Sequence, residues 1–112
     1  MKKKELKQEI EKIVFNEKGL IPCIVQSSGN NDVLMLAWMT KETLTKTIDS
    51  GYATYWSRSR GEIWIKGLSS GNKQKVNEIM IDCDKDCILL KVDQKGVACH
   101  TGEWSCFFNQ LL

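Results

Sequence analysis

The chain has 112 residues, of which 42% are hydrophobic and 27% charged, so it suits one folded domain with a single modest core. Sixteen Lys and Arg against fourteen Asp and Glu leave a net charge of +2, which is too balanced to predict binding to nucleic acid. The longest apolar stretches, such as Val33–Met39, are too short to cross a membrane.

The start of the chain predicts a helix followed by a β-hairpin. Residues 2–17 form the predicted helix, which Gly19 ends, because apolar side chains recur there at helical spacing: Leu6, Ile10, Ile13 and Val14. The apolar run 21–26, the turn-forming residues 27–32 and the returning run 33–38 together predict a hairpin.

The remaining pattern predicts a second helix and then short strands. Thr40 suits an N-cap and Gly51 a C-terminal stop, so this helix is expected over residues 41–50. Strands are expected over residues 52–57, 63–66, 76–81, 88–92 and 97–100. We therefore expect one α+β domain over residues 1–112, with a mostly antiparallel sheet, an N-terminal helix and one internal helix.

The N-terminus and the cysteines indicate the compartment. Charged residues recur through Lys18 without the apolar run of a secretory signal, so we expect a cytoplasmic protein with reduced thiols. Five is an odd number of cysteines for a disulfide framework, and four of them follow residue 82. This clustering favours a metal or a reactive thiol.

The densest group of ligand-type side chains is Asp82, Asp84 and Asp86. In an extended chain these carboxylates would share one side, with neighbours about 6.5 Å apart. Such carboxylates raise one another's pKa unless a cation neutralises them, and Mg²⁺ or Ca²⁺ is the natural partner. The alternative is a solvated acidic loop. An EF-hand is rejected, because Cys87 stands where its loop requires glycine.

The cysteines Cys83, Cys99 and Cys106 form a soft ligand set that selects zinc. Three ligands leave a position for water, as in a catalytic site, whereas a structural site would take a fourth ligand from Cys87 or His100. The spacing leaves this choice open, and the alternative is that the thiols are small buried apolar groups. His100 lies beside Cys99 and could transfer a proton at such a site.

A third group surrounds the turn at residues 58–61. Arg58 and Arg60, with Lys66 and Ser70 further along, are candidate phosphate contacts, and Trp56 is a candidate substrate contact. The residues alone favour the other interpretation, which is a charged hairpin over a packed tryptophan.

Taken in order, these segments resemble the phosphoribosyl-AMP cyclohydrolases, the ring-opening enzymes of histidine biosynthesis. The resemblance covers residues 19–108; no single motif is decisive, but the ordered set is highly specific. The matching segments are residues 20–22, 33–39, 55–60, 64–67, 70–71, 74–76, 81–86, 98–102 and 105–107.

The resemblance implies a domain-swapped homodimer with active sites at the interface, without nucleic-acid or membrane partners. It implies hydrolytic opening of the N1–C6 bond of 1-(5-phosphoribosyl)-AMP to a formimino imidazole carboxamide product, with cyclohydrolase activity alone. It also implies Zn²⁺ on ligands from both subunits and Mg²⁺ on the acidic run. The residues expected in these roles are His100 for proton transfer, Cys83, Cys99 and Cys106 for zinc, Asp82, Asp84 and Asp86 for magnesium, and Trp56, Arg58, Arg60, Lys66 and Ser70 for substrate.

Cys87 and Glu103 depart from the family pattern, and Glu103 places a negative charge where a polar or basic residue is expected. Three other functions would each need a signature of their own. A zinc nucleobase deaminase would need His-x-Glu and Pro-Cys-x-x-Cys, which the sequence lacks. A zinc-stabilised binding module would need four closed ligands. A thiol redox protein would need two residues between its cysteines, whereas Cys83 and Cys87 have three.

Overall fold

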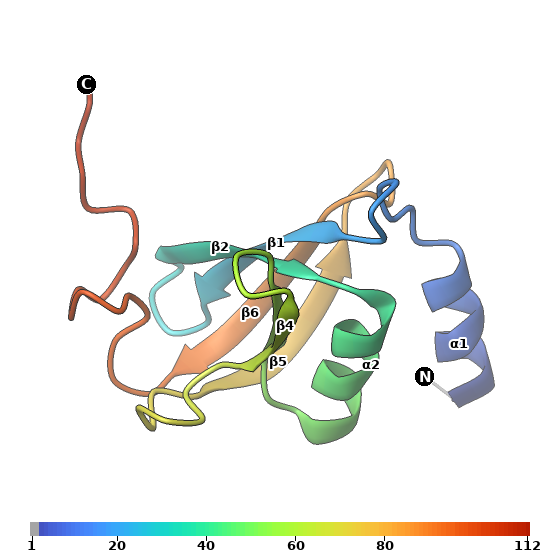
Figure 1. The fold of residues 1–112 in the computed structure, drawn as a ribbon, viewed down its shortest axis with the longest axis horizontal. Helices are drawn as coiled ribbons and strands as arrows, with labels where there is room; N and C mark the ends of the chain where they lie inside the picture. The colour runs from blue at the N-terminus through green and yellow to red at the C-terminus, as the bar shows by residue number, and fades with distance from the viewer. Residues whose placement is uncertain (1–2) are drawn as a thin grey trace.

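The structure is a computed structural model that describes residues 3–112. It has two helices and six strands within that range, which confirms the α+β class (Figure 1). No helix in residues 3–112 is long and apolar enough to span a membrane. In chain order the elements are α1 (Lys3–Glu11), β1 (Ile21–Ser27), β2 (Val33–Met39), α2 (Lys41–Ser50), β3 (Thr54–Ser57), β4 (Glu62–Ile65), β5 (Gln74–Ile81) and β6 (Ile88–Gln94).

Four strands form the main sheet, in the order β2-β1-β6-β5. The predicted hairpin of β1 and β2 is confirmed, with Ile21 opposite Met39. A second antiparallel hairpin joins β5 and β6, and the two hairpins meet along a parallel pairing of β1 with β6. The sheet is therefore mostly antiparallel, as expected, with one parallel pair at its centre.

The two faces of this sheet differ in what covers them. On the covered face, alternate residues such as Cys23 and Val25 are fully buried, and Leu44 of α2 and Tyr55 of β3 complete the core. The opposite face carries an apolar row that runs across the cross-strand partners. This open-face row consists of Leu36, Ile24, Leu89 and Met80, of which Leu36 is 49% and Met80 43% exposed.

Helix α2 has the predicted bounds because both ends are capped. The Thr40 hydroxyl accepts a hydrogen bond from the backbone N–H of Thr43 (3.1 Å), and the Thr43 hydroxyl accepts one from that of Thr40 (2.9 Å). Gly51 ends the helix with a φ of 79°, a left-handed conformation that favours glycine, and its N–H bonds Thr47 O at 2.9 Å.

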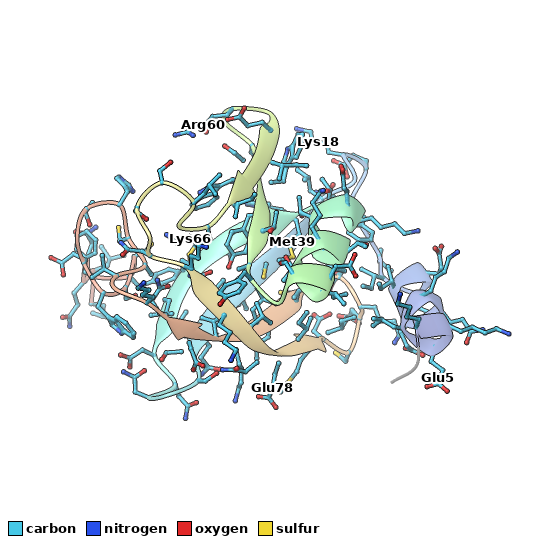
Figure 2. All side chains as sticks on the ribbon, turned by 90° about the horizontal axis from the view of Figure 1, so that it is seen from below. Glu5, Lys18, Met39, Arg60, Lys66 and Glu78 are labelled. Atoms are coloured by element: carbon cyan, nitrogen blue, oxygen red, sulfur yellow. The ribbon has the colours of Figure 1, made fainter. Side chains whose placement is uncertain are left out.

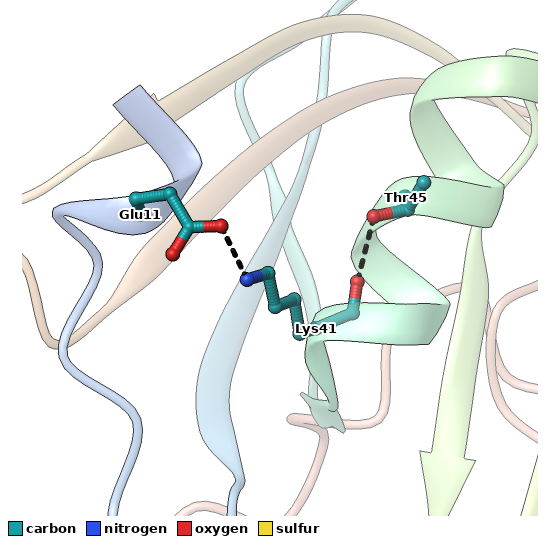
Figure 3. Close-up of polar contacts among 3 residues, drawn as sticks. All are labelled: Glu11, Lys41 and Thr45. Carbon is teal, nitrogen blue, oxygen red and sulfur yellow. Dashed lines mark hydrogen bonds and ion pairs between the residues drawn. The ribbon is translucent and has the colours of Figure 1, made fainter. Parts of the chain in front are cut away.

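Helix α1 is shorter than predicted. The prediction of helix through residue 17 is wrong beyond Glu11, while Lys2 lies outside the described residues. The N–H of Val14 bonds Lys85 O in the β5–β6 turn at 2.8 Å, so a tertiary contact replaces the next helical bond. Glu11 forms a 2.6 Å ion pair with Lys41, which joins α1 to α2 across the surface (Figure 3).

A second, two-stranded sheet is formed by β3 and β4, with Tyr55 opposite Trp64. The strand predicted over residues 97–100 is absent. There the N–H groups of Ala98 and Cys99 bond the carbonyls of Trp104 and Glu103, so the chain folds back on itself and does not join the sheet.

Candidate functional site

The acidic run forms the tight turn between β5 and β6. The N–H of Asp82 bonds Cys87 O at 3.0 Å, and the Asp82 carboxylate accepts the N–H groups of Asp86 (3.0 Å) and Cys87 (3.2 Å). The run is therefore a turn and not an extended segment. The grouping is nonetheless confirmed, because carboxylate oxygens of Asp82, Asp84 and Asp86 lie within 4.8 Å of one another. In residues 3–112 they are the one trio of metal-ligand side chains gathered this closely.

Electrostatics in this turn favour a cation. The neighbouring charge of Asp82 is the main reason that the pKa of Asp86 is raised above its ordinary value, and Asp84 adds to it. Cys87 is half-buried at the end of the turn, and its thiol pKa is raised, first by burial and then by the charges of Asp82 and Asp86. A divalent ion bound to the carboxylates would relieve this repulsion.

A second group of ligand-type side chains lies in the loop that follows β6. The backbone bonds of Ala98 to Trp104 (3.1 Å) and of Cys99 to Glu103 (3.2 Å) close this loop. The N–H of Cys106 bonds Leu34 O at 2.7 Å, which fastens the loop to the start of β2. The fold-back brings Cys99 and Cys106 together from positions seven residues apart.

The two thiols of this loop affect each other's pKa. The pKa of Cys99 is lowered, chiefly because the Thr101 hydroxyl donates a hydrogen bond to its sulfur at 3.0 Å, and Cys106 and Lys66 also lower it. The pKa of Cys106 is raised, first by burial and then by Cys99. A sulfur whose pKa is lowered thus lies beside a second sulfur, and two such donors suit a soft metal. Thr101 was missed from the sequence, because only the folded loop shows which hydroxyl meets the sulfur.

Cys83 is not part of this thiol pair. It is exposed in the turn that precedes β6, whereas Cys99 follows the other end of that strand. Figure 1 shows the two segments at opposite ends of the molecule, with the β5–β6 turn near α1 and the segment after β6 on the side of the C-terminus. Within one chain the predicted zinc trio is therefore divided into a pair and a single distant thiol.

His100 lies directly after Cys99, at the exposed tip of the loop. The turn closes behind it, since the N–H of Gly102 bonds Cys99 O at 3.1 Å. An exposed imidazole next to the thiol pair could reach a ligand that approaches from solvent.

The predicted substrate contacts are spread over both ends of the β3–β4 hairpin. At its turn, the Arg58 guanidinium lies 4.4 Å from the centre of the Trp38 ring, and Arg60 makes a long 3.9 Å ion pair with Glu62. Trp56 is half-buried on β3. Lys66 and Ser70 follow the far end of β4, and Figure 2 shows Lys66 well away from Arg60. One chain therefore does not gather all five around one ligand.

A cavity of about 540 Å³ opens beside Lys66, between the end of α2 and the ends of β3 and β4. Three lysines line it, and of the predicted substrate residues it includes only Lys66. Lys46 and Lys73 were missed from the sequence, because they belong to no motif and meet only when α2 packs beside the loop before β5. The lining residues are Lys46, Asp49, Ser50, Tyr52, Thr54, Ile65, Lys66 and Lys73.

Comparisons with known proteins agree with one another. The family model described as phosphoribosyl-AMP cyclohydrolase matches residues 35–108. The chain is 56% identical over 103 residues to the curated phosphoribosyl-AMP cyclohydrolase of Herminiimonas arsenicoxydans, a match that covers 91% of this chain and 77% of that protein. It is 57% identical over 97 residues to the one of Hyphomonas neptunium, covering 87% and 74%. For that of Chlorobium limicola, identity is 55% over 101 residues, covering 90% and 74%.

Proposed function

The chain belongs to the phosphoribosyl-AMP cyclohydrolase family, and from that premise we propose that it hydrolyses the adenine ring of 1-(5-phosphoribosyl)-AMP in histidine biosynthesis. Water adds at C6, the N1–C6 bond breaks, and N1 takes up the proton, which gives the formimino imidazole carboxamide ribonucleotide. The observation that carries the proposal is the identity above 50% with named cyclohydrolases over most of the chain. We place the reaction in the cytoplasm, where the five free thiols would stay reduced.

Zinc is the first cofactor of the proposal. The donor set fits it, because Cys99 and Cys106 offer adjacent sulfurs and Thr101 favours the thiolate of Cys99. When bound, zinc supplies a Lewis acid that makes water a nucleophile near neutral pH. His100, exposed beside Cys99, is the residue that we expect to carry a proton during ring opening.

The third zinc ligand, Cys83, is proposed to come from a second copy of the chain in a domain-swapped homodimer. Two features support this proposal. Cys83 lies at the opposite end of β6 from the thiol pair. In addition, the open-face row leaves four apolar side chains of one sheet face without a covering layer, and the chain end exposes further apolar residues. Those at the chain end are Phe107, Phe108, Leu111 and Leu112.

Magnesium is the second cofactor of the proposal. Asp82, Asp84 and Asp86 offer the hard oxygen ligands that this ion prefers, and their mutual repulsion favours its binding. The ion would in turn help to neutralise the phosphates of the substrate. Trp56, Arg58, Arg60 and Ser70 stay the expected substrate contacts, from both subunits of the dimer.

An ultraviolet assay of purified protein with phosphoribosyl-AMP tests the proposal, before and after removal of zinc with a chelator. We expect turnover that stops on chelation and returns with zinc. Cys99→Ser should lose zinc and turnover together, whereas Cys87→Ser, the matched control outside the trio, should keep both. Absence of turnover in zinc-loaded, magnesium-supplemented dimer would refute the activity, and full turnover by zinc-free protein would refute the role of the metal.

A further inference from the structure

Lys66 follows β4 and directs its ammonium group into the protein. The residue is only 7% exposed, and its Nζ donates a hydrogen bond to Ala98 O at 2.7 Å. Lysine is seldom buried this deeply unless an anion accompanies it. Among residues 3–112, the ion pairs are Lys12 with Glu9, Lys41 with Glu11 and Arg60 with Glu62, so no carboxylate pairs with Lys66.

The groups that face Lys66 show where its counter-charge lies. The Trp64 ring is on one side, with Nζ 5.4 Å from the ring centre. Ala98, whose carbonyl accepts the Lys66 bond, is followed directly by Cys99, and the thiols of Cys99 and Cys106 are near enough to act on the ammonium. The thiol pair, once it binds a metal, would thus bring the negative charge that this ammonium lacks.

The backbone around Lys66 is built to keep this arrangement. Gly67 has a φ of 79°, and a side chain there would collide with the backbone of Asn72 and Lys73 at about 2.5 Å. Asn72 in turn lies against Gly96, where a Cβ would come within 2.3 Å of its side-chain oxygen. The segment after β4 therefore packs tightly on the segment that leads to the thiol pair.

We infer that Lys66 is a positioning residue for zinc, which holds the Cys99 loop through Ala98 and balances the charge of the thiolates. The inference rests on the proposed zinc site. A Zn²⁺ ion with three thiolates carries one net negative charge, which a neighbouring ammonium cancels in a poorly solvated place. The bond to Ala98, next to Cys99, fixes the backbone from which the ligand projects. This reassigns Lys66, which was expected to bind phosphate.

The test is a competition titration of zinc against a chromophoric chelator, on zinc-free protein. Lys66→Met removes charge and hydrogen bond, and we expect zinc to bind about 10- to 100-fold more weakly, as for other residues that support metal ligands. Lys66→Gln keeps a donor without the charge and should fall in between, whereas Lys66→Arg should recover part of the affinity. Lys46→Met is the matched control, because Lys46 lines the same cavity from α2 and is in none of the side-chain hydrogen bonds of residues 3–112, so the zinc affinity of this variant should be unchanged.

Circular dichroism of each variant checks that it is folded. If Lys66→Met is not folded, the zinc affinity of Lys66→Gln is compared with that of the wild type in its place. Zinc affinity within twofold of wild type in the folded Met or Gln variant overturns the inference. A raised KM for substrate with unchanged zinc affinity also overturns it and returns Lys66 to the phosphate. If the wild-type protein itself binds no zinc, the proposed zinc site is refuted, and the titration of the wild-type protein alone shows this.

Discussion

The proposed division of the zinc ligands between two chains predicts how mixed dimers behave. Cys83→Ala and Cys99→Ala should each abolish zinc binding and turnover when present in both subunits. In a heterodimer of the two variants, the intact Cys83 of one subunit meets the intact Cys99 and Cys106 of the other. One of the two sites is thereby restored, while the second site lacks both substituted ligands.

The dimensions of the fold show why Cys83 and Cys99 of one chain cannot share a zinc ion, and hence how much turnover a mixed dimer should keep. Strand β6 has seven residues, which span about 23 Å at the usual rise, and Cys83 and Cys99 lie beyond its opposite ends. Two sulfurs on one zinc ion, each about 2.3 Å from it, are at most about 4.6 Å apart. Cys83 and Cys99 of one chain are therefore too far apart to bind the same zinc ion while the chain stays folded. A purified heterodimer should therefore show about half of the wild-type turnover, because one of two symmetry-related sites is intact.

The assay uses co-expressed variants with different affinity tags, so that two purification steps isolate the heterodimer. Turnover and bound zinc are then measured per dimer. The matched control pairs Cys99→Ala with Cys106→Ala, which lie on the same loop, so both sites stay damaged and no turnover should return. A verified heterodimer of Cys83→Ala and Cys99→Ala without activity would show that the site is not shared in this way.

Three further predictions follow from single contacts. The charge of Asp82 raises the pKa of Asp86, so the folded state binds the Asp86 proton more tightly than the unfolded state does, and the stability that this proton provides is lost as the pH rises through the folded pKa. Asp86→Asn should therefore raise the melting temperature at pH 7 without magnesium. A lower melting temperature would contradict the repulsion. His100→Gln should keep zinc but lower kcat by about 10²- to 10⁴-fold in the ultraviolet assay, and an unchanged kcat would remove it from the reaction. Tyr55→Phe removes the hydrogen bond to the buried Gln74 and should lower the free energy of unfolding by about 1–3 kcal/mol in urea at fixed protein concentration, whereas an unchanged value would mean that another group satisfies Gln74.

Local sequence determined those elements whose signals lie within a few residues. Thr40 and Gly51 bound α2 because capping involves only the helix and its neighbours. The alternation of apolar residues predicted the first hairpin for the same reason. The carboxylates of the acidic run lie together although the run is a turn, because three side chains within five residues remain close in either an extended segment or a turn.

Tertiary structure decided the features that depend on distant partners. Helix α1 ends early because Lys85, far along the chain, takes the N–H of Val14. Residues 97–100 leave the sheet because their hydrogen bonds go to the segment that brings Cys106 back to Cys99. The sequence offered Cys83, Cys99 and Cys106 as equivalent ligands, and only the fold separates one from the other two.

Lys66 shows that the direction of a single side chain can also depend on a distant part of the chain. In the sequence Lys66 is only a candidate phosphate contact. The direction of its ammonium depends on where Ala98 comes to lie, 32 residues later. Local spacing thus determined most of the helices and strands, and the ordered motifs carried the resemblance to the family. Which of the candidate ligands lie together was decided by long-range packing, since it fixes which distant backbone segments meet.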